Sequence, residues 1–75
     1  MNDEVRAQWG TNIRILRKAR GMTLRQLADK VDVTEATVSR WECGKAGIRD
    51  DHKVRVAEAL HADVRILFPL VRGAA

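Results

Sequence analysis

The sequence predicts an all-α fold in which roughly four to five helices pack into one small domain. Apolar residues recur at helical spacing in several segments, and no alternation typical of a β-strand lasts more than a few residues. The single proline lies near the C-terminus and interrupts none of these segments. Since the chain has 75 residues, we expect one domain over 1–75, with its core over about 8–68 and a short tail over 69–75.

Apolar stripes define the first two helices. Trp9, Ile13 and Leu16 lie at positions i, i+4 and i+7, and we expect Gly21 to follow the last turn of this helix. Thr23 is suited to cap the second helix. That helix carries the fullest amphipathic pattern in the chain, made by Leu24, Leu27, Ala28 and Val31.

A break at Asp32 and Val33 separates the second helix from a third, which we expect Thr34 to cap. The inner side of the third helix is predicted to consist of Thr37, Val38 and Trp41. The glycine-containing stretch 44–47 then predicts a loop.

Two aspartates, Asp50 and Asp51, favour the start of a fourth helix, because negative charge stabilises the positive end of a helix dipole. Its inner face is predicted to consist of Val56, Ala57 and Leu60. Asp63 can cap a short fifth helix that Pro69 ends. This helix is predicted to carry Val64, Leu67 and Phe68.

Composition narrows the class of function. The formal net charge is +4 and the pI is about 10.0, which favours nucleic acid or an anionic membrane as partner. The longest apolar stretch, 66–71, is too short to span a bilayer, and the N-terminus does not resemble a signal peptide. A single cysteine, Cys43, allows no internal disulfide and suits a reducing compartment. We therefore expect a cytoplasmic protein with no membrane partner.

The residues that could serve a thiol enzyme or a metal site are Cys43, His52 and His61. Their spacing supports neither kind of site, because a structural zinc ion needs four ligands and no further ligand residues stand at suitable spacing from these three. We therefore expect no enzyme activity, no metal and no cofactor, and no small-molecule ligand is indicated. Control through oxidation of Cys43 remains open, since it depends on the pKa of the thiol.

The second and third predicted helices, over about 23–43, are joined by a short turn, which is typical of a DNA-reading pair. At about 100° per residue, one outer arc of the third helix holds Glu35, Ala36, Ser39, Arg40 and Cys43. Arginine can donate twice to guanine, glutamate can accept from cytosine, and small residues permit close approach to the major groove.

Residues 22–45 (MTLRQLADKVDVTEATVSRWECGK) resemble the helix-turn-helix of the Cro/cI-type (XRE) family of bacterial and phage regulators. The resemblance depends on the order of Leu27-Ala28, Val33-Thr34 and the run 39–45, and extends more loosely from Trp9 to Phe68. It implies a lambda-repressor-like fold and a sequence-specific transcriptional regulator of double-stranded DNA. Without a following ligand-binding or protease-like domain, the chain is most similar to small Cro-like repressors or controllers.

The family's roles transfer to matching positions. The resemblance implies base-reading roles for residues on the outer arc, namely Glu35, Ala36, Ser39 and Arg40. Phosphate contacts are implied near the helix N-termini and the following loop, and further cations are candidates; this set is Thr34, Gln26, Lys45, Arg25 and Arg14. Glu35 can instead orient Arg40 or cap the helix, and Arg14 can belong to an ordinary solvated face. Arg17 and Glu42 match a pair that joins the first helix to the recognition helix.

Several residues depart from the family pattern. Asp32 and His61 stand where glycine is usual, Cys43 replaces Asn or Arg, and the loop after Lys45 lacks the usual proline. Lys53 falls on an inner, usually apolar position of the fourth helix. Either its stem packs inward while its amine reaches solvent, or the register differs there.

We expect a homodimer, at least on DNA, that reads an inverted repeat, because one recognition helix covers only a few base pairs. Leu67 is expected to close the core, and the candidates for a two-fold contact are Phe68, Leu70 and Val71. The tail can alternatively fold back on its own domain. A different class remains open, an antitoxin-like or anti-repressor-like module that binds protein, although the polar arc of the third helix favours DNA.

Overall fold

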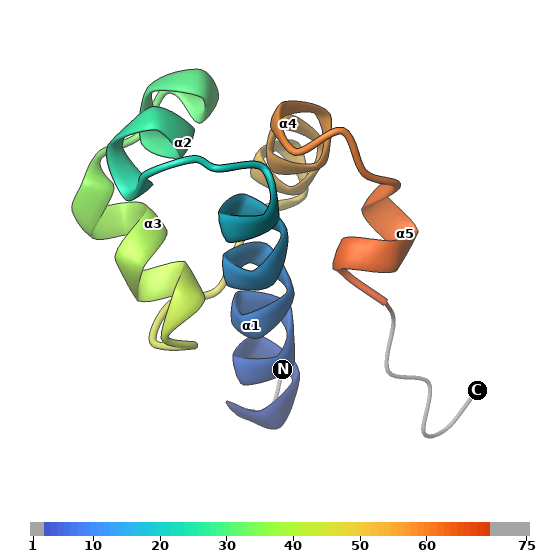
Figure 1. The fold of residues 1–75 in the computed structure, drawn as a ribbon. Helices are drawn as coiled ribbons and strands as arrows, with labels where there is room; N and C mark the ends of the chain where they lie inside the picture. The colour runs from blue at the N-terminus through green and yellow to red at the C-terminus, as the bar shows by residue number, and fades with distance from the viewer. Residues whose placement is uncertain (1–2, 70–75) are drawn as a thin grey trace.

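Five α-helices make up the computed structural model, which describes residues 3–69 (Figure 1). They are α1 (Asp3–Ala19), α2 (Leu24–Val31), α3 (Glu35–Glu42), α4 (Asp50–Ala59) and α5 (Val64–Leu67). No strand lies within this range, so the all-α prediction is confirmed. None of these helices combines the length and the apolar character that crossing a membrane would require.

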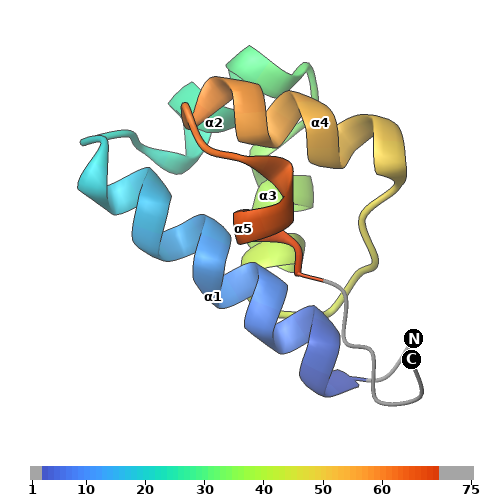
Figure 2. The same ribbon diagram turned by 90° about the vertical axis from the view of Figure 1, so that its right-hand side faces the viewer.

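The long helix α1 lies between two groups of elements. Helices α2 and α3 lie on one side of it and α5 on the other, while α4 runs across the far end and contacts both α2 and α5 (Figures 1 and 2). The core between them receives side chains from every helix and from the loop before α4. Its large members are Trp9, Ile13, Leu27, Val31, Val38, Trp41, Ile48, Val56, Leu60, Leu67 and Phe68.

The helix boundaries follow the capping signals of the sequence. Gly21 has a positive φ of 68°, and the N–H groups of Gly21 and Met22 donate to the carbonyls of Lys18 and Arg17, which closes the end of α1. Thr23 and Gln26 form a reciprocal capping box at the start of α2. The predicted helix boundaries at Gly21 and Thr23 are therefore confirmed.

Two non-glycine residues adopt the left-handed conformation where glycine is usual in the resembled family. Asp32 ends α2 with a φ of 65°, and His61 follows α4 with a φ of 54°. Aspartate tolerates this conformation better than most residues, so the turn between α2 and α3 forms without glycine. The departures at Asp32 and His61 thus leave the backbone path intact.

Lys53 keeps the expected register on α4 and turns its stem inward. Its Nζ lies 4.1 Å from the centroid of the Trp9 ring and 3.4 Å from Oδ1 of Asp50, and its side chain is only 15% exposed. A cation–π contact with the indole ring of Trp9 and an ion pair with Asp50 therefore replace part of the hydration of the amine.

Phe68 corrects one expectation from the sequence. It was a candidate for a two-fold contact, but its side chain is 5% exposed and packs edge-to-face on Trp9, with ring centroids 5.7 Å apart. The indole Nε1 of Trp9 also donates to Pro69 O at 3.0 Å, which holds this segment against α1. Phe68 is thus a core residue; Leu70 and Val71 lie outside the described residues. Leu67 is fully buried, as expected.

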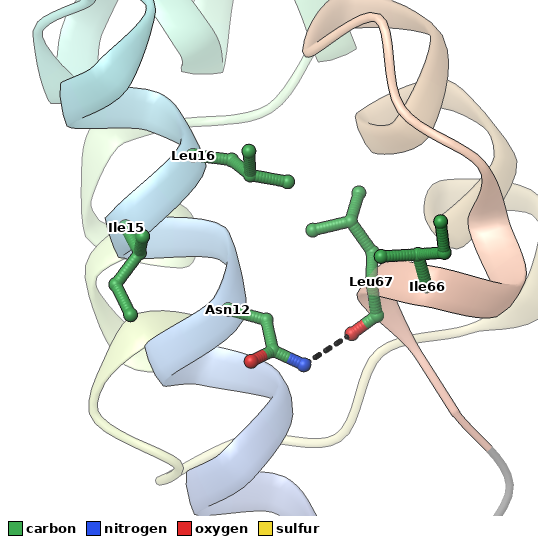
Figure 3. Close-up of a pocket in the computed structure, with 5 residues that line it drawn as sticks. All are labelled: Asn12, Ile15, Leu16, Ile66 and Leu67. Atoms are coloured by element: carbon green, nitrogen blue, oxygen red, sulfur yellow. Dashed lines mark hydrogen bonds between the residues drawn. The ribbon is translucent and has the colours of Figure 1, made fainter.

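A small apolar groove of about 180 Å³ lies between α1 and α5, lined by Asn12, Ile15, Leu16, Ile66 and Leu67 (Figure 3). Leu16 and Leu67 point toward each other across it. Ile15 and Ile66 are 60% and 70% exposed, so two large apolar side chains lie at the surface beside this groove. We call this feature the α1–α5 groove.

Candidate nucleic-acid interface

Helix α3 presents one polar face to solvent and one apolar face to the core. Val38 and Trp41 are buried, whereas Glu35, Ala36, Arg40 and Cys43 are exposed and Ser39 is half-buried. The outer arc expected from helix geometry is therefore open along its length, and small side chains separate the two charged ones. A polar helix face of this kind, with small side chains between the charged ones, is of the type that reads a major groove.

An ion pair between Arg17 and Glu42 fixes the end of α3 to α1. Arg17 Nε donates to Glu42 Oε2 at 2.6 Å and its Nη2 to Oε1 at 3.1 Å, while Nη1 donates to Met22 O at 2.8 Å. The two side chains are only 10% and 7% exposed. A bidentate, charge-assisted ion pair of this kind has one preferred geometry. It therefore fixes the positions of α1, of the end of α3 and of the connection between α1 and α2 relative to one another.

Two contacts at the end of α3 were not predicted from the sequence. The ring of Trp41 packs against that of His52, with centroids 5.3 Å apart, so α4 supports the inner side of α3. Gly10 meets the last turn of α3 where a side chain has no room. A glycine inside a helix at an apolar helix crossing is the one clue that could have pointed to this close approach.

The residues predicted to lie near helix N-termini also serve as caps. Thr34 Oγ1 accepts from the N–H of Thr37 at 3.2 Å and lies 2.9 Å from its hydroxyl. Gln26 Oε1 accepts from Thr23 N at 2.8 Å. The amide Nε2 of Gln26 has no acceptor among residues 3–69, so it is free to donate to a ligand.

Three predicted phosphate-binding cations are exposed around α3. Arg25 lies in the first turn of α2, and Lys45 lies in the loop after α3. Arg14 lies on α1 between Gly10 and Arg17, the positions through which α1 contacts the end of α3. These cations therefore come from three elements, namely α1, α2 and the loop after α3.

Two other arginines are engaged with carboxylates. Arg49 donates to Asp51 and holds the pKa of that carboxyl below its usual value. Arg65 does the same for Asp63 by a side-chain bond and by its backbone N–H, and its own pKa is raised by Asp63. These arginines are less available to a ligand than Arg25, Arg40 or Lys45.

Among the described residues, no group of at least three His, Cys, Asp or Glu side chains lies close enough together to hold a metal ion. Cys43 is a free, exposed thiol at the C-cap of α3, on the outer arc.

The chain is similar to known proteins in sequence and in fold. Residues 13–67 match the family model of the helix-turn-helix group HTH_3. The clp gene regulator ClgR from Corynebacterium glutamicum is 30% identical, with a TM-score of 0.80 over 84% of this chain and 82% of that chain. The restriction-modification controller protein C.AhdI from Aeromonas hydrophila is 27% identical, with a TM-score of 0.81 over 84% of this chain and 96% of that chain. No curated protein matches the sequence.

Proposed function

The chain belongs to the HTH_3 helix-turn-helix family and is a DNA-binding transcriptional regulator, and we propose that it reads the major groove with the outer arc of α3. The observation that carries this proposal is the exposed polar face of α3, rigidly backed by Val38, Trp41 and the Arg17–Glu42 pair. An arc that is polar, with no large apolar side chain, suits base edges better than the centre of a protein interface. Its action is binding, so no catalytic step is assigned to it.

Arg40 is the principal base-reading residue in this proposal. It is exposed in the last turn of α3 and makes no ion pair with any described residue, so its guanidinium can donate twice to a guanine. Glu35 stands in the first turn, where it can accept from cytosine. Ala36 and Ser39 lie between them and permit the backbone to approach the base edges.

Phosphate binding is assigned to the residues that border this arc. Thr34 and Gln26 lie at the starts of α3 and α2, where N–H groups and the helix dipole favour an anion. Arg25, Lys45 and Arg14 add positive charge from three sides. These contacts supply affinity and register, whereas the arc of α3 supplies sequence discrimination.

Two copies of the chain are proposed to act together on an inverted repeat. A single α3 has too few exposed side chains to specify a unique site, and two copies related by a two-fold axis read half-sites about 34–36 Å apart. The proposed contact between copies is the α1–α5 groove, which lies on the opposite side of α1 from α2 and α3 (Figure 1). Both recognition helices therefore remain free in such a dimer.

The α1–α5 groove suits a second copy because it carries both a recess and a protruding apolar side chain. In a two-fold contact, Ile66 of each copy meets the recess of the other. The polar atoms of Asn12 are already satisfied, since Nδ2 donates to Leu67 O at 2.8 Å and Oδ1 accepts from Gln8 at 2.9 Å. Covering the groove therefore leaves neither the nitrogen nor the oxygen of the Asn12 amide without a hydrogen-bond partner.

The experiment that tests the function is selection of binding sites from a random duplex library, followed by gel shifts on the enriched and a scrambled sequence. Enrichment of an inverted repeat, bound far more tightly than the scrambled duplex, supports sequence-specific DNA binding. Equal binding to both duplexes, with no enriched sequence, contradicts it and favours the protein-binding class of antitoxins and anti-repressors.

A further inference from the structure

Arg6, in the second turn of α1, makes no hydrogen bond or ion pair with any described side chain through its Nε. Its Nε is closed off from solvent and has no hydrogen-bond partner, a state that no other side-chain nitrogen or oxygen of the described residues shares. None of the ion pairs found among residues 3–69 includes Arg6. An N–H group that is closed off from water and has no acceptor disfavours the free protein.

The position of Arg6 on α1 directs it toward the recognition unit. Arg6 lies on the same stripe of α1 as Gly10, Ile13 and Arg17, at i, i+4, i+7 and i+11. Gly10 and Arg17 are the residues that contact the end of α3. The side chain of Arg6 therefore leaves α1 on the face that is turned to α3 and to the loop that follows it.

The loop after α3 holds Arg6 in place. A Cβ built on Gly44 would lie 3.0 Å from Ala7 Cα and 3.4 Å from the carbonyl carbon of Arg6, so the loop backbone lies directly on this turn of α1. A Cβ on Gly47 would lie 4.0 Å from Arg6 Nε, which places the guanidinium beside the same loop. Lys45, between these two glycines, is exposed.

We propose that Arg6 is a phosphate-binding residue and that, together with Lys45, it binds the DNA backbone beside the end of α3. This inference rests on the proposed function and extends the DNA-binding surface to the second turn of α1, outside the helix-turn-helix. Neither terminal amino group shares the closed-off state of Nε, and no hydrogen bond from either is found among residues 3–69, so both keep contact with solvent, the side from which a phosphate would approach. A phosphodiester supplies the anionic acceptor that the described residues do not.

The test compares three full-length variants, Arg6→Gln, Arg6→Lys and the control Arg55→Gln, which removes one exposed charge from α4. Affinity for the enriched duplex and for a scrambled duplex is measured across a salt series. Arg6→Gln is expected to weaken binding to both duplexes by the same factor and to lower the slope of log affinity against log salt by about 0.9. Arg6→Lys is expected to keep most of the slope, and Arg55→Gln all of it.

A slope for Arg6→Gln equal to that of the unmodified chain overturns the proposal, whether or not the variant melts at a lower temperature. An equal loss of slope in Arg55→Gln also overturns the proposal, because the change in salt dependence would then come from the lower net charge and not from a contact made by Arg6. If the unmodified chain binds the enriched duplex and only the Arg6 result fails, the proposed function stands without this contact. If the unmodified chain shows no preference among duplexes, the proposed function itself fails.

Discussion

Gly10 in α1 lies directly on the backbone of Glu42 at the end of α3. A Cβ atom at position 10 would stand 2.6 Å from the carbonyl oxygen of Glu42 and 2.8 Å from its carbonyl carbon, and it would collide with the carbonyl oxygen of Trp41. The obstacle is backbone, which cannot turn aside as a flexible side chain can. The crossing of α1 and α3 is therefore possible only with glycine at this position.

Gly10→Ala is expected to destabilise the protein, although alanine normally stabilises a helix interior by about 0.5–1 kcal/mol relative to glycine. Separating α1 from α3 should cost about 1–3 kcal/mol or more, which outweighs the gain in helix propensity. Urea unfolding measures the difference. Thr11→Ala, at the adjacent exposed position, is the control and should be close to neutral. A Gly10→Ala protein as stable as the control would show that the two helices can move apart freely.

Local signals in the sequence predicted most of the fold, because helix ends depend on neighbouring residues. The N-cap roles of Thr34 and Asp63 are examples, since each side chain accepts from a backbone N–H two or three residues ahead. Each of these predictions needed only a few residues of sequence and no knowledge of tertiary packing. The left-handed conformation of Asp32 was indicated differently, by the family pattern, which usually has glycine at this position.

Contacts between distant segments were harder to predict. The apolar stretch at the C-terminus looked available for a partner, but Phe68 packs on Trp9, which lies far away in sequence. The close contact of Gly10 with α3 and the closed-off Nε of Arg6 likewise depend on how α1 packs against α3 and the loop that follows it. Apolar content alone does not distinguish core from interface, since both bury the same kind of surface. The ion pair of Arg17 and Glu42 was expected because a family pattern, not periodicity, pointed to it.

A double-mutant cycle on Arg17 and Glu42 should give a large coupling energy. Glu42→Ala leaves a buried guanidinium without its acceptor, which is expected to cost about 3–5 kcal/mol of unfolding free energy. The coupling should exceed the range of about 0.2–1 kcal/mol that is typical of exposed pairs. The control is the pair Arg49 and Asp51, whose side chains are 73% and 56% exposed and should show little coupling. Similar coupling energies in the two cycles would show that burial does not strengthen the Arg17–Glu42 pair.

Arg40→Ala should reduce discrimination between duplexes more than it reduces binding in general. Losing a bidentate contact to one base is expected to cost about 1–3 kcal/mol on the specific site and little on a scrambled duplex. Lys45→Ala provides the contrast: it should weaken both duplexes equally and lower the salt slope by about 0.9. Titrations on both duplexes separate these cases. If Arg40→Ala loses the same factor on each duplex, Arg40 contacts phosphate and reads no base.

The carboxylate of Asp63 should make stability depend on pH at the acid end. The side-chain bond from Arg65, followed by its backbone N–H at 2.7 Å, holds the pKa of Asp63 in the folded state below its ordinary value. Its contribution is therefore complete above the unfolded-state pKa and is lost as pH falls through the lower, folded-state pKa. Urea midpoints of the unmodified chain and Asp63→Asn should differ at neutral pH and converge in acid. A difference that stays constant across this range would exclude the charged interaction as its cause.

Ile66→Asp should abolish association between copies while leaving each copy folded. The side chain is 70% exposed on α5, so an aspartate there is solvated in a monomer and costs the fold little. In a two-fold contact through the α1–α5 groove, the same aspartate would be buried in an apolar recess without a partner. Val54→Asp is the matched control, because Val54 is 50% exposed on α4 and lies outside the groove.

Sedimentation of the free chains and footprinting on the selected duplex provide the two measurements. The unmodified chain and Val54→Asp should protect both half-sites of the inverted repeat with a binding curve steeper than that of a single site. Ile66→Asp should sediment as a monomer, and it should need a higher protein concentration to fill the second half-site, because contacts across the two-fold axis no longer help. If Ile66→Asp behaves like Val54→Asp in both measurements, the copies do not meet through the groove. If the unmodified chain protects one half-site only, with binding linear in protein concentration, the protein acts as a monomer and the dimer proposal is wrong.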